Sequence, residues 1–153
     1  HKIRNLITQL GKLLAVEGDA LELVKAVEVG FDSLGRFSDQ RVAYLIWNEP
    51  KMAVGSGNYI HDVLERIGLT NALRYKPRYP EVNLQELADL QLDFLFLSSE
   101  PFPFSEKHIE AFRQALPQTR IVLVDGEMFS WYGNRMVPAL CYFHELRSQL
   151  SNV

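Results

Sequence analysis

The chain has 153 residues and a formal net charge of −3; 47% of its residues are hydrophobic and 23% are charged. This composition is ordinary for a globular domain with one hydrophobic core. An acidic balance without a basic stripe argues against a nucleic-acid partner, because phosphate contacts need clustered lysine and arginine. No apolar run approaches the ~20 residues of a membrane-spanning helix. Cys141 is the single cysteine, so no internal disulfide can form.

The first part of the chain predicts two amphipathic helices. Apolar residues recur at helical spacing from Ile3 to Leu14, and the spacing returns from Leu21 to Phe31. Gly18 followed by Asp19 predicts a helix end and then the N-cap of the second helix. We therefore expect a helix–turn–helix arrangement before any strand.

From Arg41 onward, short apolar runs alternate with helical patterns. Buried strands covered on both faces are predicted at about 42–47, 94–98 and 121–125. Asn83 and Ser105 are expected to cap helices, Gly68 to end one, and a final helix to run from about Gly133 to Leu150. Residues 73–82 are expected to form a loop or an edge strand. This alternation predicts an α/β fold: a three-layer, Rossmann-like lobe with a mostly parallel central sheet.

The loops after the three predicted strands carry large apolar side chains, although loops are normally polar. Ligands of open α/β sheets bind beyond the carboxyl ends of the strands, where these loops lie. Aromatic faces with a few carboxylates suit a large, partly apolar, planar ligand. Capping of the sheet is the alternative for any single aromatic, but all three loops together favour a binding surface. Its candidate residues are Trp47, Met52, Glu100, Phe102, Glu127 and Trp131.

Catalytic patterns are weak. His61, His108 and His144 fall on separate predicted helices without the spacing of metal ligands. The segment Ser98-Ser99-Glu100 lacks a nucleophile elbow, and Gly55-Ser56-Gly57 lacks the Gly-Lys-Ser/Thr of a phosphate-binding loop. The chain is therefore predicted not to be an enzyme and to hold no covalently bound cofactor. A Rossmann-like nucleotide- or small-molecule-binding enzyme domain and a cytosolic sensor module remain the alternatives.

Three segments carry a resemblance to a known family. VAYLIWNEPKMAVGSGNYIHDVLERIGLTNAL resembles the opening of the second lobe in the helical-backbone (class III, cluster A) periplasmic substrate-binding proteins of cobalamin and iron-chelate ABC importers. RYPEVNLQELADLQLDFLFLSSEPFP and VDGEMFSWYGNR are similar to later segments of that lobe. The resemblance covers essentially the whole chain. It implies that residues 1–35 are the end of the inter-lobe backbone helix and a following helix, that residues 36–153 are the C-terminal ligand-binding lobe, and that an N-terminal lobe precedes His1.

The resemblance also implies a function. The protein would be the solute-binding component of an ABC importer, capturing a metal chelate (cobalamin, haem or a ferric siderophore) and delivering it to a membrane permease and its ATPase. Its location would be periplasmic, or extracytoplasmic with a membrane anchor. Because His1-Lys2-Ile3-Arg4 leads directly into a helical pattern, the secretory signal is expected to lie outside this sequence.

Individual residues carry over from the family by position. The cleft contacts of cobalamin-binding members correspond to Met52, Tyr79, Glu127 and Trp131, whereas Trp47, Glu100 and Phe102 are expected from the loop argument alone. The family docks on its permease through a carboxylate on each lobe. The aligned position holds Gln85 with Glu86 beside it, so Gln85 and Glu86 are the expected docking residues and Glu81 is a substitute.

Overall fold

The structure, a computed structural model, describes residues 2–34, 40–130 and 136–151. The chain divides into two compact units: a helical unit (His1–Gly35 with Trp131–Val153) and a sheet unit (Arg36–Ser130). The helical unit takes in the C-terminal helix, which the resemblance assigns to the lobe at 36–153. Compactness alone does not define a family lobe, so that boundary stays a prediction.

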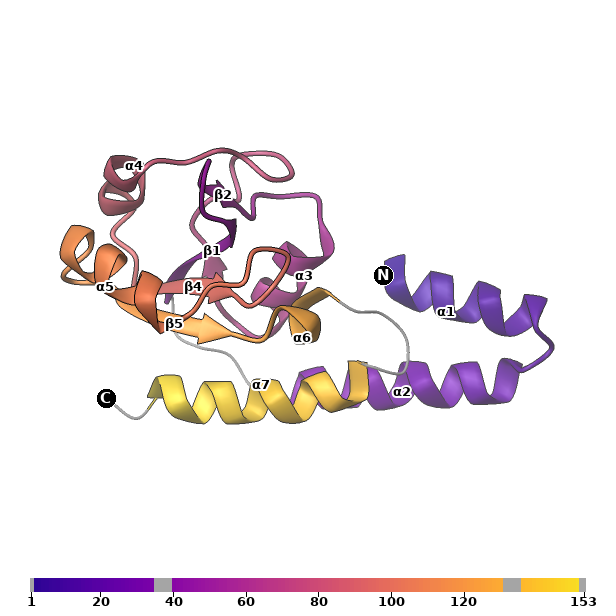
Figure 1. The fold of residues 1–153 in the computed structure, drawn as a ribbon. Helices are drawn as coiled ribbons and strands as arrows, with labels where there is room; N and C mark the ends of the chain where they lie inside the picture. Colours follow the sequence, from indigo (N-terminus) through magenta and orange to yellow (C-terminus); the bar gives the residue numbers. More distant parts are fainter. Residues whose placement is uncertain (1, 35–39, 131–135, 152–153) are drawn as a thin grey trace. The chain divides into compact units, whose positions relative to one another are not determined.

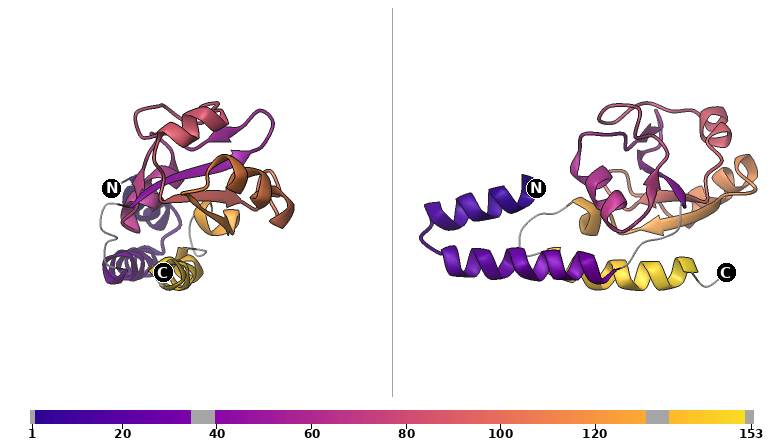
Figure 2. Two further views of the ribbon diagram at one scale, coloured as in Figure 1. Left: turned by 90° about the vertical axis from the view of Figure 1, so that its left-hand side faces the viewer. Right: turned by 180° about the vertical axis from the view of Figure 1, so that it is seen from behind.

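The helical unit contains α1 (Lys2–Leu13), α2 (Glu17–Ser33) and α7 (Met136–Ser151). Helices α1 and α2 form a hairpin (Figures 1 and 2) in which a Cβ at Gly11 would overlap the Cβ of Ala20. The chain reverses at Ala15, whose φ is 56°. Gly18 and Asp19 lie inside the first turn of α2, so the predicted helix break and N-cap there are wrong. An acidic residue in the first turn of a helix is stabilised by the helix dipole. In the sequence, an aspartate at that position cannot be told from an aspartate at the N-cap.

Helix α2 packs beside α7 within the helical unit. The rings of Phe31 and Phe143 lie 6.2 Å apart. Ser33 Oγ pairs with the His144 ring at 3.2 Å, and the Arg147 guanidinium donates to the main-chain oxygen of Leu34. Aromatic packing and polar contacts therefore join two helices that are far apart in the sequence.

The described part of the sheet unit contains a five-stranded sheet. Its strands are β1 (Arg41–Trp47), β2 (Met52–Ala53), β3 (Thr70–Asn71), β4 (Phe94–Ser98) and β5 (Arg120–Val124). The order is β2-β1-β4-β5, with β3 pairing β1; β1, β3, β4 and β5 run parallel, and β2 is antiparallel. The predicted mostly parallel α/β fold is confirmed.

Helices cover both faces of this sheet (Figure 1). They are α3 (Tyr59–Arg66), α4 (Leu84–Asp89), α5 (Glu106–Ala115) and α6 (Gly126–Ser130). Because strand side chains alternate between faces, Leu45 and Leu97 join one core with residues of α4 and α5. Tyr44 and Phe96 point to the other face, where both rings contact Phe129 of α6 at 5.1 and 6.1 Å. Helix α3 packs against α6. The result is the predicted three-layer arrangement.

Strand β5 differs from the two strands beside it in sequence character. In β4 every residue is buried, as expected for a central parallel strand. Strand β5 is the outermost strand on its side of the described sheet; Arg120 is exposed and residues 121–123 are half-buried. The prediction of a strand covered on both faces is therefore wrong for β5. A run such as Ile-Val-Leu-Val records apolar character but not whether a neighbouring strand follows.

Several local predictions hold. The Asn83 side chain accepts from the Glu86 N–H and caps α4, and Gly68, at φ 91°, follows α3. Residues 73–82 form an irregular edge along β2, with main-chain bonds from Ala53 N to Pro80 O and from Gly55 N to Arg78 O. The final helix is described from Met136, so its predicted start at 133 lies outside the described residues. Within the described ranges, no helix has the length and apolar character needed to cross a membrane.

A buried asparagine fixes the edge of the sheet. Asn71 is fully buried; its Nδ2 donates to Val54 O at 3.1 Å, and its Oδ1 accepts from Leu73 N at 3.0 Å. The same Nδ2 lies 3.2 Å from His61 Nδ1, and the Asn71 N–H donates to Glu65 Oε1 at 3.1 Å. We call this set the Asn71 joint. It ties β3, α3 and the segment after β2 together.

Candidate functional site

The carboxyl ends of β1 and β4 carry a cluster of rings, which we call the aromatic rim: Trp47, Phe102, Phe104 and His108. The Trp47 and Phe102 rings lie 5.7 Å apart, edge to face, and Phe102 lies 4.7 Å from Phe104. Exposure falls from 38% at Trp47, through half-buried Phe102, to 6% at Phe104. The rim is therefore an exposed aromatic edge on a buried aromatic base.

The strand register brings the two outer rings together. Strands β1 and β4 are parallel neighbours with Leu45 opposite Leu97, so their carboxyl ends meet. The Phe102 N–H donates to Ile46 O at 3.3 Å and fastens the loop after β4 to the end of β1. The Trp47 indole N–H donates to Glu49 O at 3.1 Å. Two residues that the sequence singled out on separate loops are thus in contact.

His108 forms part of the base of the rim, although the sequence gives it no metal-ligand spacing and does not predict it as a site residue. Its ring lies 5.3 Å from Phe102 and 5.6 Å from Phe104. The N–H of Ser105 donates to His108 Nδ1 at 3.0 Å. Ser105 precedes His108 by three residues, which is the spacing of a capping box. That spacing was the sequence signal for this residue.

A second group lies where the loops after β4 and β5 meet. The Gly126 N–H donates to Ser99 Oγ at 2.9 Å. A Cβ at Gly126 would lie 2.5 Å from Glu100 Cγ, so the Glu100 side chain passes directly over that glycine. Glu127, half-buried in the first turn of α6, has its N–H bonded to Asp125 Oδ1 at 3.0 Å. The structure therefore brings Glu100 to the start of the helix that carries Glu127.

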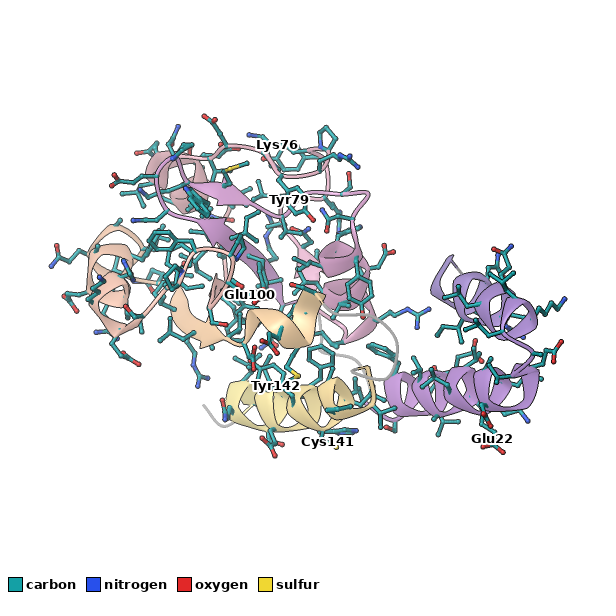
Figure 3. All side chains as sticks on the ribbon, turned by 45° about the vertical axis from the view of Figure 1, so that its right-hand side comes forward. Glu22, Lys76, Tyr79, Glu100, Cys141 and Tyr142 are labelled. Atoms are coloured by element: carbon teal, nitrogen blue, oxygen red, sulfur yellow. The ribbon has the colours of Figure 1, made fainter. Side chains whose placement is uncertain are left out.

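The other predicted contacts divide in two. Met52 stands opposite Trp47 in the β1–β2 pairing and is half-buried, so it belongs with the rim. Tyr79 is 40% exposed on the edge beside β2, whereas Glu100 comes from the loop after β4 (Figure 3). No ring contact joins Tyr79 to the rim in the described part of the chain. Trp131 lies outside the described residues, so its place in a cleft stays a prediction.

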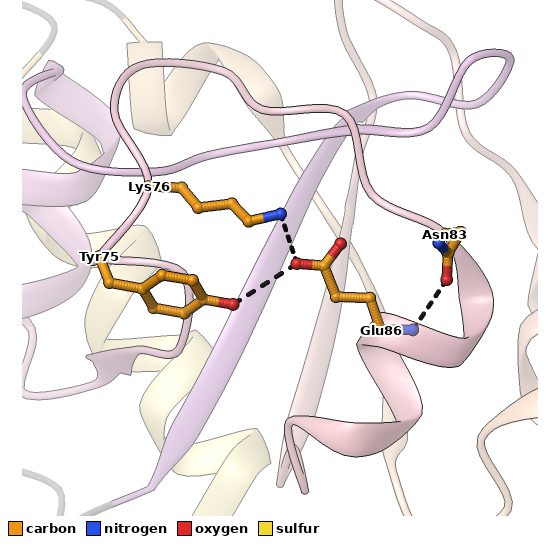
Figure 4. Close-up of polar contacts among 4 residues, drawn as sticks. All are labelled: Tyr75, Lys76, Asn83 and Glu86. Carbon is orange, nitrogen blue, oxygen red and sulfur yellow. Dashed lines mark hydrogen bonds and ion pairs between the residues drawn. The ribbon is translucent and has the colours of Figure 1, made fainter.

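The expected docking residues lie on α4. Gln85 is exposed and its side-chain amide donates to Asp89 Oδ1 at 2.9 Å. The Glu86 carboxylate lies 2.5 Å from Lys76 Nζ and accepts from Tyr75 Oη at 3.4 Å (Figure 4). The charge of Glu86 is therefore compensated inside the sheet unit. Glu81, the substitute, is exposed.

Residues 55–57 do not form a phosphate cradle. Gly55 N donates to Arg78 O at 2.8 Å and Ser56 N donates to Lys76 O at 2.7 Å. The N–H groups that would hold a phosphate are thus used in main-chain pairing. Among the described residues, no group of three or more His, Cys, Asp or Glu side chains could hold a metal ion.

No model of a protein family matches the chain, and no curated protein matches it in sequence. Solved structures share its fold, and three of them compare with this chain as follows. A possible iron-binding, periplasmic solute-binding protein of Staphylococcus epidermidis is 21% identical with a TM-score of 0.80, over 98% of this chain and 62% of that one. The periplasmic heme-binding protein of Vibrio cholerae is 18% identical, with a TM-score of 0.75 over 94% and 60%. The periplasmic vitamin B12-binding protein of Vibrio cholerae is 14% identical, with a TM-score of 0.70 over 99% and 62%.

These likenesses define the class of fold. The chain has the fold of a lobe of periplasmic solute-binding proteins, as the resemblance implied. The chain spans about three fifths of the length of each of these structures. All three are binding proteins rather than enzymes.

Proposed function

We propose that the protein is the ligand-binding lobe of the solute-binding component of an ABC importer for a metal chelate. The observation that carries the proposal is the aromatic rim: Trp47, 38% exposed, stands on Phe102 at the carboxyl ends of two parallel strands. Ligands of open α/β sheets bind at those ends. Support comes from the fold shared with heme- and B12-binding proteins.

Capture would use the rim and its neighbours together. The faces of Trp47 and Phe102, with Met52 beside them, would cover the flat part of a corrin, porphyrin or siderophore complex. Glu100, Glu127 and Tyr79 would supply the few polar contacts that fix the orientation of a bound ligand. A second lobe would form the opposite wall, and the proposed location is extracytoplasmic. Trp131 is proposed as a further aromatic contact.

Delivery would use a different face. We propose α4, with Gln85 and Glu86, as the surface that meets the permease of the importer and its ATPase. Because Lys76 already pairs with Glu86, a permease arginine would have to replace Lys76 at that carboxylate. Glu81 is exposed and needs no such exchange.

Equilibrium dialysis against cyanocobalamin, haemin and ferrioxamine B tests the proposal. We expect saturable binding of at least one chelate. Trp47→Ala should weaken it about tenfold, since a lost aromatic contact is worth roughly 1 kcal/mol beyond the lost area. Tyr75→Ala is the matched control, because Tyr75 is 62% exposed and contacts Glu86 instead of the rim. Absence of saturable binding to all three chelates would contradict the proposal.

A further inference from the structure

We infer that His108 is a positioning residue: it holds the Trp47–Phe102 edge in place, and only its neutral imidazole does so. The part of this inference that concerns ligand affinity rests on the proposed function. The part that concerns the environment of Trp47 does not.

The contacts of the rim form a chain that leads to His108. Phe104 is anchored independently, since it is buried and its ring lies 6.3 Å from Phe112 of α5. Phe102 is only half-buried, and its ring neighbours among the described residues are Trp47, Phe104 and His108. A shift of the imidazole therefore removes one of the inner supports of Phe102. Trp47 would follow, because Phe102 is its ring partner.

The hydrogen bond of His108 distinguishes its two protonation states. Nδ1 accepts from the Ser105 N–H at 3.0 Å, so in this arrangement Nδ1 carries no proton and the ring is neutral. Protonation turns Nδ1 into a donor and leaves the Ser105 N–H without its acceptor. Ser105 Oγ, 3.2 Å from Nδ1, is then the nearby oxygen that can accept, and a bond to it changes the ring's position. Histidine side chains commonly change charge between about pH 5 and 8.

Other charges around the rim do not replace this bond. Helix α5 carries Glu106, Lys107 and Glu110, all exposed. The loops after β1 and β4 carry exposed Glu49, and Lys51 and Glu100, which are half-buried. Exposed charges are screened by water and salt. Lys51 lies over the Phe112 ring at 5.9 Å. The contact that protonation of the His108 ring disrupts is therefore the hydrogen bond that Nδ1 accepts from the Ser105 N–H.

The test uses the full chain with Trp131→Phe, which leaves Trp47 as the single tryptophan. Trp47 emission is measured in this variant from pH 5 to 8. The dissociation constants of cyanocobalamin and ferrioxamine B are measured over the same pH range with Trp131 in place, because Trp131 is a proposed ligand contact; haemin is omitted because its propionates can themselves titrate. With His108 present, we expect the emission to shift and affinity to fall about three- to tenfold at the acidic end, the worth of one hydrogen bond.

Two variants separate the roles of His108. His108→Gln keeps an acceptor at the capping position, as glutamine does in capping boxes, so it should fold and give flat pH profiles. His108→Phe keeps a ring but no acceptor and should also be flat, with the emission of the acidic form. His144→Gln, a change of an exposed histidine in the helical unit, should leave the wild-type profile unchanged.

The outcomes are distinguishable. An emission profile that is flat with His108 present, or equally pH-dependent in His108→Gln, overturns the inference. Chelates that fail to bind at every pH contradict the proposed function, while the emission of Trp47 still decides the role of His108.

Discussion

In most proteins polar side chains are exposed and aromatic side chains are buried. The Asn71 joint and the aromatic rim each depart from this rule, one with a buried polar residue and the other with an exposed aromatic. At the joint a polar side chain is fully buried, and at the rim a tryptophan is 38% exposed. The burial of Asn71 is accounted for within the chain, because its side-chain Nδ2 and Oδ1 both have hydrogen-bond partners. In the described part of the chain, no comparable set of contacts accounts for the exposed face of Trp47. The comparison teaches that the buried polar residue is satisfied by the scaffold, whereas the exposed aromatic on a packed base is the surface at which we propose that a ligand binds.

The largest expected effect is on the scaffold side. Asn71→Leu leaves Leu73 N–H and Val54 O without their partner in a buried region. Each unsatisfied buried group costs about 1–3 kcal/mol, so we expect the free energy of unfolding to fall by roughly 4 kcal/mol. Urea unfolding measures this. The control is Asn83→Ser, which retains a capping side chain and should cost less than about 0.5 kcal/mol. A similar small loss for both variants would remove the distinction drawn here.

Effects of intermediate size are expected where the aromatic rim meets the hydrophobic core. Phe102→Ala removes a half-buried ring that contacts Trp47 and Phe104. We expect a stability loss of about 1–2 kcal/mol, because only part of the area of a fully buried phenylalanine is involved. Phe104→Ala, at a position only 6% exposed, should cost about 3 kcal/mol, the lower end of the range for buried aromatic rings. Thermal and urea unfolding compare the two; equal losses would show that Phe102 belongs to the core.

The smallest expected effect is at α4, the proposed docking surface. Glu86→Gln breaks the ion pair with Lys76 while keeping a group that can accept from Tyr75. Surface ion pairs are worth about 0–1 kcal/mol, so stability should change by less than about 1 kcal/mol. Chelate affinity should not change, since Glu86 is not among the residues of the rim. Dialysis and urea unfolding of one preparation measure both quantities. A loss of affinity beyond about threefold would connect α4 to the ligand site.

The sequence predicts the fold well where a pattern is local. The apolar runs ending at Trp47 and Ser98 form the strands expected of them, and Asn83 caps α4. Prediction from the sequence fails where the environment of a residue depends on a neighbour that is distant in the chain or absent from the sheet. The exposure of β5 depends on the absence of a further strand beside it in the described sheet, and the pairing of Glu86 depends on Lys76, ten residues earlier in the chain.

The candidate site follows the same rule. Trp47 and Phe102 could be predicted, because both follow strands whose ends must meet in a parallel sheet. His108 could not be found from a search for metal ligands, since its role is to cap a helix and support rings. Asn71 could not be found from a sequence pattern, because the five partners of its side chain and N–H come from three different segments: Val54, Gly55, His61, Glu65 and Leu73.

Gly126 has a consequence for how such a lobe can diverge. A methyl group there would meet Ser98 Oγ and Glu100 Cγ, each at 2.5 Å, so the Glu100 carboxylate would have to move. Substitution at position 126 would thereby displace Glu100, a proposed polar contact, without changing any residue of the aromatic rim. If the proposed site binds a ligand, two homologous lobes with the same aromatic rim could select different ligands through the residue at position 126 alone. Substitution of Gly126 is therefore a way to change the position of Glu100 while the surface residues themselves stay the same.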